Sequence, residues 1–141
     1  MTRKEAFVRL MEGFAIDRNR HADMSKLLDR QFAAALRRDA SSLTETGDEI
    51  LALANVLGAS HETRRKEIRA LVAPMKPESV AQVCEALPGT ARDKLMREWA
   101  QFELRVLECS RLNQRNAALM TSQYATMQRV LQGEVDTYVY R

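Results

Sequence analysis

A heptad pattern of unusual length runs through the C-terminal third of the chain. From residue 95 onward, the positions on one helix face follow each other at alternating spacings of four and three. They are Leu95, Trp99, Phe102, Val106, Cys109, Asn113, Asn116, Met120, Gln123, Met127 and Val130. This spacing predicts one helix over about residues 91–132, packed against a partner helix along its length. About 42 residues that rise 1.5 Å each would make that helix roughly 60 Å long.

The chemistry of this face changes halfway along the predicted helix. Large side chains and a cysteine occupy it up to Cys109, and amides then enter at Asn113, Asn116 and Gln123. Amides at such positions cost stability, while they fix the register of two helices or leave a surface adaptable. We therefore expect residues 95–109 to be buried and residues 112–131 to be at least partly open.

Two earlier segments supply partner helices for the long one. The first covers about residues 3–38, and the second begins near Ser42 and ends before Pro74. Ser42 and Glu45 have the spacing of a capping box, and a proline ends a helix at the preceding residue. The apolar members of the two heptad registers are Phe7, Leu10, Phe14, Met24, Leu28 and Ala35, then Leu43, Ile50, Leu53, Leu57 and Leu71.

A proline-rich corner separates the second helix from the long one. Pro77 is suited to the first position of a short helix that ends before Pro88. Thr90 and Asp93 then have capping-box spacing at the start of the long helix. The sequence thus predicts an all-α fold, namely an elongated antiparallel bundle or coiled coil of three long helices with a short extra helix at about residues 77–87. All 141 residues form a single helical domain in this interpretation.

Composition excludes several classes of protein. Apolar residues make up 45% of the chain and only five glycines and three prolines occur, which favours helix. The chain has no run of eighteen apolar residues and no signal-peptide core, so neither a membrane span nor secretion is expected. Two cysteines are too few for a disulfide framework, and we expect a cytoplasmic protein.

The sequence contains no constellation that suggests catalysis. His21 and His61 have no second His or Cys at ligand spacing, and Cys84 has no predictable base. The glycines are too scattered to form a phosphate-binding loop. We therefore predict that the chain is not an enzyme and binds no metal or cofactor. The net charge of +3 is spread among alternating acidic and basic residues, so nucleic-acid binding is not expected either.

The amide-bearing part of the long helix also carries flexible apolar side chains. Met120, Tyr124 and Met127 fall at i, i+4 and i+7 and share a helix face. Methionine adapts to irregular surfaces, and a helix face of this kind suits helical partners. The alternative, that these residues are simply part of the core, stays open from spacing alone.

The end of the chain resembles the FlgN family of flagellar type III export chaperones. The resemblance spans most of the chain, and it is specific over the last thirty residues. It rests on the run LNQRNAAL at residues 112–119, followed by Gln123, by Leu131-Gln132-Gly133 and by Thr137-Tyr138. The chain departs from the family at its tail, where Val139-Tyr140-Arg141 follow Tyr138 while relatives often show glycine and a longer tail.

The resemblance implies a function and a set of site residues. It implies a chaperone that binds the C-terminal helical segments of the hook-associated proteins at the hook–filament junction, prevents their premature assembly and delivers them to the export gate. By position it implies that Tyr138 contacts the cytosolic domain of the membrane export-gate protein. The client-binding residues that it implies are Leu112, Asn113, Asn116, Leu119, Met120, Gln123, Met127 and Leu131. We add Tyr124 to them, because it shares a helix face with Met120 and Met127.

A second interpretation follows from the heptads alone. The same pattern is typical of a self-associating helical adaptor or a structural coiled coil without enzymatic activity. A homodimer that buries residues 112–131 would favour that interpretation over a chaperone. The sequence leaves the oligomeric state open.

Overall fold

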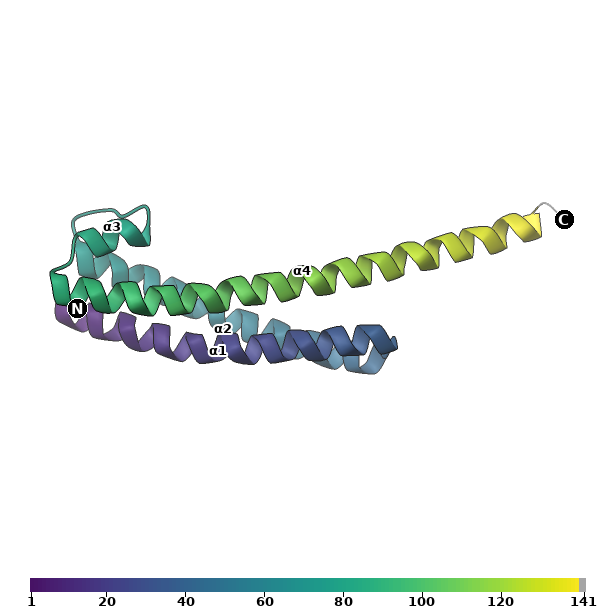
Figure 1. Cartoon of the computed structure of the whole chain (residues 1–141), viewed down its shortest axis with the longest axis horizontal. Coiled ribbons are helices and arrows are strands. Elements are labelled where there is room, and N and C mark those ends of the chain that lie inside the picture. Colours follow the sequence, from purple (N-terminus) through teal and green to yellow (C-terminus); the bar gives the residue numbers. More distant parts are fainter. Residues whose placement is uncertain (140–141) are drawn as a thin grey trace.

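The computed structural model shows an all-α protein, as predicted, and describes the backbone of residues 1–139 and the side chains of residues 1–133. Four helices follow each other along the chain (Figure 1). They are α1 (Arg3–Arg37), α2 (Ala40–Val72), α3 (Val80–Glu85) and α4 (Gly89–Val139). The three long helices and the short extra helix of the sequence prediction are confirmed.

The turn between α1 and α2 is tight because two residues carry it. Arg38 adopts the left-handed conformation (φ 55°, ψ 39°) and ends α1. Asp39 then caps α2, and its carboxylate accepts a hydrogen bond from the Ser42 backbone N–H at 3.1 Å. The prediction of a capping box that starts at Ser42 was wrong, because the carboxylate of Asp39 takes the N–H groups of the first turn.

The short helix in the corner between α2 and α4 has fewer residues than predicted. Ser79 caps α3, so Pro77 lies outside the helix rather than at its first position. The long helix begins at Gly89, which places Thr90 inside it and not at its cap. The guanidinium group of Arg92 donates to the carbonyl oxygens of Cys84, Glu85 and Leu87 at 3.0–3.2 Å. These bonds fasten the corner to the first turn of α4.

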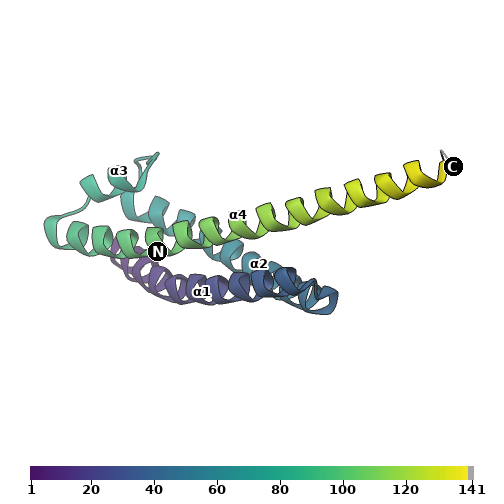
Figure 2. The same cartoon turned by 45° about the vertical axis from the view of Figure 1, so that its right-hand side comes forward.

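Helix α1 is the centre of the bundle, since it packs against both α2 and α4. Helix α2 runs antiparallel to α1, whereas α4 runs parallel to it (Figures 1 and 2). Three side chains of α4 donate to backbone carbonyls of α1 that lie 88 positions earlier in the chain: Cys109, Asn116 and Gln123. Because these contacts recur every seven residues with one offset, each heptad of α4 faces α1 in the same orientation.

The core divides into two clusters along α1. The larger one lies near the corner, where the Phe14 ring packs edge-on against Trp99 and Phe102, with centroids 6.1 and 5.1 Å away. The smaller cluster lies nearer the α1–α2 turn and consists of Met24, Leu28, Cys109 and Leu112, with Ile50, Leu53 and Leu57 packed against it. The expected burial of residues 95–109 is confirmed for Leu95, Phe102 and Cys109, while Trp99 and Val106 are half-buried.

A buried ion pair joins α1 to α2 beside the larger cluster. Asp17 is fully buried and pairs with Arg64 of α2 and with Arg20 of its own helix. Burial alone would raise the pKa of Asp17, but hydrogen bonds from Ser60, Arg20 and Arg64 outweigh it and hold that pKa below its usual value. The Arg64 guanidinium also lies over the Phe102 ring, 4.8 Å from its centroid.

Helix α4 continues past the end of the α1–α2 hairpin. The offset of 88 places Arg37, the last residue of α1, beside residue 125. The backbone of residues 126–139 therefore projects beyond the hairpin, as both views show (Figures 1 and 2). At 1.5 Å per residue this projection is roughly 21 Å long.

Candidate functional site: an open face of α4 and a groove beside α2

The residues that the family resemblance implied for client binding all lie on α4, but they differ in exposure. Leu112 and Asn116 are buried, at 3% and 0% exposure. Asn113 is exposed, and Leu119, Met120 and Gln123 are half-buried. Of the predicted client-binding residues, the large apolar side chains with the highest fractional exposure are Tyr124 (67%), Met127 (49%) and Leu131 (49%). The prediction that residues 112–131 are at least partly open thus fails at Leu112 and Asn116, where α1 covers α4.

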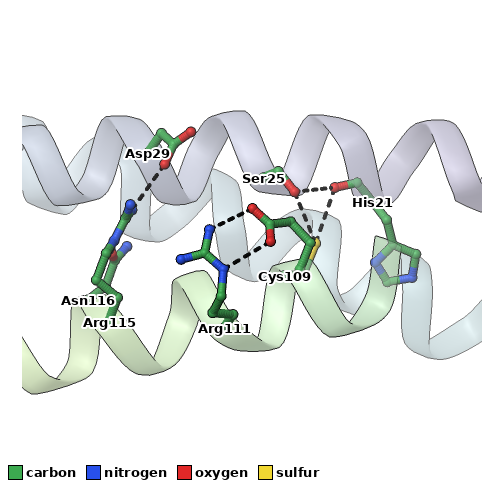
Figure 3. Close-up of polar contacts among 8 residues, drawn as sticks. His21, Ser25, Asp29, Cys109, Arg111, Arg115 and Asn116 are labelled. Carbon is green, nitrogen blue, oxygen red and sulfur yellow. Dashed lines mark hydrogen bonds and ion pairs between the residues drawn. The ribbon is translucent and has the colours of Figure 1, made fainter. Parts of the chain in front are cut away.

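Asn116 is held by contacts within the chain. Its Nδ2 donates to the Leu28 carbonyl at 2.7 Å and to Gln31 Oε1 at 2.9 Å. Its Oδ1 accepts from Arg115 at 3.1 Å, and the Arg115 guanidinium also pairs with Asp29 at 3.0 Å (Figure 3). Asn116 therefore fixes α4 against α1, as expected of an amide at a heptad position.

Gln123 repeats this arrangement one heptad later. Its Nε2 donates to the carbonyl oxygen of Ala35 at 2.8 Å. The neighbouring side chains of α1 are small, since Ala34 and Ala35 are fully buried alanines that let the amide approach the backbone. Gln123 is thus a third side chain of α4 that bonds to α1 in the register set by Cys109 and Asn116.

An apolar stripe follows directly after Gln123. We call it the C-terminal stripe and define it by Tyr124, Met127, Val130 and Leu131, which are 49–67% exposed. No apolar cluster of the described residues includes these four side chains. Neighbouring large apolar side chains that stay exposed together mark an interaction surface. The stripe lies where α4 leaves the hairpin, so its surroundings leave room for another helix.

A groove of about 500 Å³ opens between α2 and α4 nearer the corner. It exists because α2 and α4 pack mainly on α1 and less closely on each other, where the Arg64 guanidinium lies over the Phe102 ring. Its floor includes Phe14 and His21 of α1. The residues that α2 and α3 contribute are Leu57, Gly58, His61, Arg64, Arg65, Ile68 and Val80, and those that α4 contributes are Trp99, Phe102, Glu103, Val106 and Leu107.

His21 gives the groove a buried polar atom. Its ring packs edge-on against Phe102 with centroids 5.3 Å apart. Burial lowers the pKa of His21, and the positive charge of Arg64 adds to this, although the Asp17 carboxylate opposes it. The Nδ1 atom of His21 is buried and has no hydrogen-bond partner among the described residues. A buried polar atom without a partner is rare, and a bound molecule is one way to satisfy it.

Both cysteines are buried thiols. Cys109 Sγ lies 3.2 Å from the His21 carbonyl oxygen and 3.4 Å from Ser25 Oγ (Figure 3). Burial raises the pKa of Cys109, and burial likewise raises the pKa of Cys84. A raised pKa keeps a thiol protonated and a poor nucleophile.

In the part of the chain with described side chains, no three His, Cys, Asp or Glu residues are placed to hold a metal ion.

Two further predictions concern the C-terminal end and the membrane. Tyr138 belongs to the last turn of α4, but its side chain lies outside those that the structure describes. Among the described residues, none of the helices is both long and apolar enough to cross a membrane. The first finding leaves the implied contact of Tyr138 with the export gate as a prediction.

The groove was not predicted from the sequence, although a signal for it was present. The heptad pattern of α2 indicates only an inner side that packs in a bundle. Residues 50–61 of α2 include no Asp, Glu, Lys or Arg, which is unusual for a helix that faces water on its outer side. That run could have pointed to a second surface awaiting a partner.

Comparisons with known proteins complete the description of the site. A comparison with known protein families matches residues 1–133 to the family described as FlgN protein. The match covers all of the helices up to Gly133, including the groove and the C-terminal stripe. Searches of curated proteins and of solved structures gave no match.

Proposed function

Because the chain belongs to the FlgN protein family, whose members are flagellar export chaperones, we propose that it captures the C-terminal helical segments of the hook–filament junction proteins. In this proposal it also prevents their premature assembly and delivers them to the export gate. The observation that carries the proposal is the C-terminal stripe, an exposed apolar face on a helix that projects beyond its own bundle.

The physical reason lies in the chemistry of such a client. A helix that packs inside a filament exposes an apolar face before assembly, and that face aggregates unless another surface covers it. The stripe offers two flexible or large apolar side chains, Met127 and Leu131, next to the amphipathic Tyr124. Methionine adapts to different partners, and an amphipathic helix binds such a face through side chains at i, i+3, i+4 and i+7.

We divide the predicted client-binding residues into two roles. Of those with described side chains, the open or half-buried ones that make no hydrogen bond to α1 contact the client in this proposal: Asn113, Leu119, Met120, Tyr124, Met127 and Leu131. Leu112, Asn116 and Gln123 act through the bundle, since they hold α4 on α1 and thereby aim the stripe. Tyr138 is proposed to contact the cytosolic domain of the export-gate protein. We further propose that the chain is one domain and acts in the cytoplasm.

The test is co-purification of the chain with a junction protein. An intact client should be retained, and a client that lacks its C-terminal helix should be lost. Met127→Asp should weaken retention at least about tenfold, because it places a charge against an apolar face. Leu104→Asp is the matched control, since Leu104 is 69% exposed on the same helix but outside the stripe. Equal retention of both clients would contradict the proposal.

The same stripe also supports the second function, a self-associating adaptor. An exposed apolar face is covered equally well by another copy of the chain. Light scattering over a range of concentrations separates the two functions. A tight dimer that Met127→Asp dissociates, without capture of a junction protein, would favour the adaptor.

A further inference from the structure

The groove beside α2 continues along the bundle on both of its walls. On α4, Trp99 and Val106 line it, and the heptad repeats these positions as Asn113, Met120 and Met127. Because the bonds of α4 to α1 recur at seven-residue steps with one offset, this series stays on the side of α4 that faces α2. The groove wall on α4 therefore leads without interruption into the C-terminal stripe.

The wall on α2 continues in the same way. Leu57 and Gly58 line the groove, and one heptad earlier the corresponding positions are Ile50 and Leu51. Ile50 and Leu57 are only half-buried, and Leu51 is 62% exposed. No heavy atom outside the local backbone lies within 4 Å of the place where a Cβ on Gly58 would be. Ile50 and Leu57 thus pack partly on the smaller core cluster, while α2 leaves apolar surface exposed at Leu51 and free space at Gly58.

One segment of each wall carries no charged residue. Residues 50–61 of α2 and residues 116–128 of α4 contain no Asp, Glu, Lys or Arg. A helix that faces water on one side normally interleaves charged residues there, whereas a helix covered on several sides does not need them. These two segments have the composition of helices that another element covers.

We propose that α2 and α4 are the walls, and α1 the floor, of one continuous trough that seats a single amphipathic client helix as the fourth helix of the bundle. This inference rests on the proposed chaperone function and names the place of its client. The trough extends over residues 50–68 of α2, which at 1.5 Å per residue gives roughly 27 Å, or a client helix of about 18 residues. A large apolar side chain of the client fills the deep end between Trp99 and Leu57.

Length argues for a client over a second copy of the chain. Helix α4 is bound to α1 up to Gln123, and α1 and α2 cover each other. Among the described residues, the segment that a second copy could lend is the projecting 126–139, which at roughly 21 Å is shorter than the trough. A second copy would have to open its own bundle to supply more.

The deep end of the trough also indicates what the client carries. Arg65 lies on the α2 wall and Glu103 on the α4 wall. A client helix with an acidic flank toward α2 and a basic flank toward α4 would match them. Such rim charges set orientation more than affinity.

The test fills the trough with a side chain of the chaperone itself. Gly58→Leu adds a large side chain where space is free, and leucine is a better helix former than glycine. Ala59→Leu adds the same side chain at the next position, which is exposed and does not line the groove. The probes are fluorescein-labelled C-terminal helical segments of the two junction proteins from the same genome. Gly58→Leu should weaken their binding by about tenfold or more, because an occupied site overpacks.

The control and stability measurements decide between the outcomes. Ala59→Leu should bind as the wild-type chain does, and neither variant should melt at a lower temperature than wild type. Unchanged binding by Gly58→Leu, together with a loss in Met127→Asp, would overturn the trough and leave the proposed function standing. A wild-type chain that binds neither probe would overturn both. A wild-type dimer that Gly58→Leu dissociates would overturn the inference by assigning the trough to a second copy.

Discussion

Asn116 offers the sharpest test of how α4 is held. Asn116→Ala removes an amide that is fully buried and bonded on both of its polar atoms. The change leaves Gln31 Oε1 without its donor and the Arg115 guanidinium N–H groups without the Asn116 acceptor. The Leu28 carbonyl keeps its bond within α1. At about 1 kcal/mol for each of two lost bonds, plus a small cavity, the fold should lose about 2.5 kcal/mol.

Urea unfolding followed by circular dichroism measures this loss. With a slope of about 2 kcal/mol per molar urea, the midpoint should fall by about 1.2 M. Asn113→Ala is the matched control, because Asn113 belongs to the same run but is exposed, and its change should stay within about 0.5 kcal/mol. In a double-mutant cycle with Gln31→Ala, the coupling should be about 1 kcal/mol. Equal midpoints for the two asparagine variants would refute the account of Asn116 as a residue that fixes α4 on α1.

Three further predictions concern stability. Asp17→Asn should cost about 3 kcal/mol near neutral pH, because it leaves Arg64 buried without its ion pair. The pKa of Asp17 lies below its usual 3.8, so its stabilising effect is complete above pH 3.8 and is lost as pH falls through the folded-state pKa. The difference in urea midpoint between Asp17→Asn and wild type should therefore be smaller in acid than at neutral pH. An equal difference at both pH values would contradict this. Glu67→Gln should raise the free energy of unfolding at neutral pH by up to about 1 kcal/mol, and with it the melting temperature, since burial raises the pKa of Glu67 and disfavours its charge. A lower melting temperature would mean that the attraction of Glu67 to Arg9 and Arg64 prevails. Gly47→Ala should raise the free energy of unfolding, measured by urea titration, by about 1 kcal/mol, because the new methyl group meets no heavy atom outside the local backbone within 4 Å. A decrease would show that the space is not free.

The sequence predicted the helices well because their signals are local. Heptad spacing marked all three long helices, and Pro74 and Pro88 marked the corner between them. The errors were at the caps, where Asp39 and Ser79 took the roles assigned to Ser42 and Pro77. Several residues with capping side chains compete within a few positions there, and only the path of the chain decides among them.

The site was harder to predict because spacing does not show which partner covers a face. Asn116 and Met127 belong to one heptad series, yet one is fully buried and the other is half exposed. The difference arises from the length of α1, which ends beside residue 125 and leaves the rest of α4 uncovered. The groove escaped prediction for a related reason, since nothing local reveals that α2 and α4 pack mainly on α1 and less closely on each other.

Hydrogen–deuterium exchange of the chain, with and without the C-terminal segment of a junction protein, locates the surface that the client covers. We predict that client binding slows exchange in residues 124–133 of α4 and in residues 50–61 of α2, the two surfaces that expose apolar side chains. The first turns of α1, packed on both neighbours, should exchange at an unchanged rate. Binding that leaves both open segments unprotected would contradict the account, because the client would then lie elsewhere on the molecule.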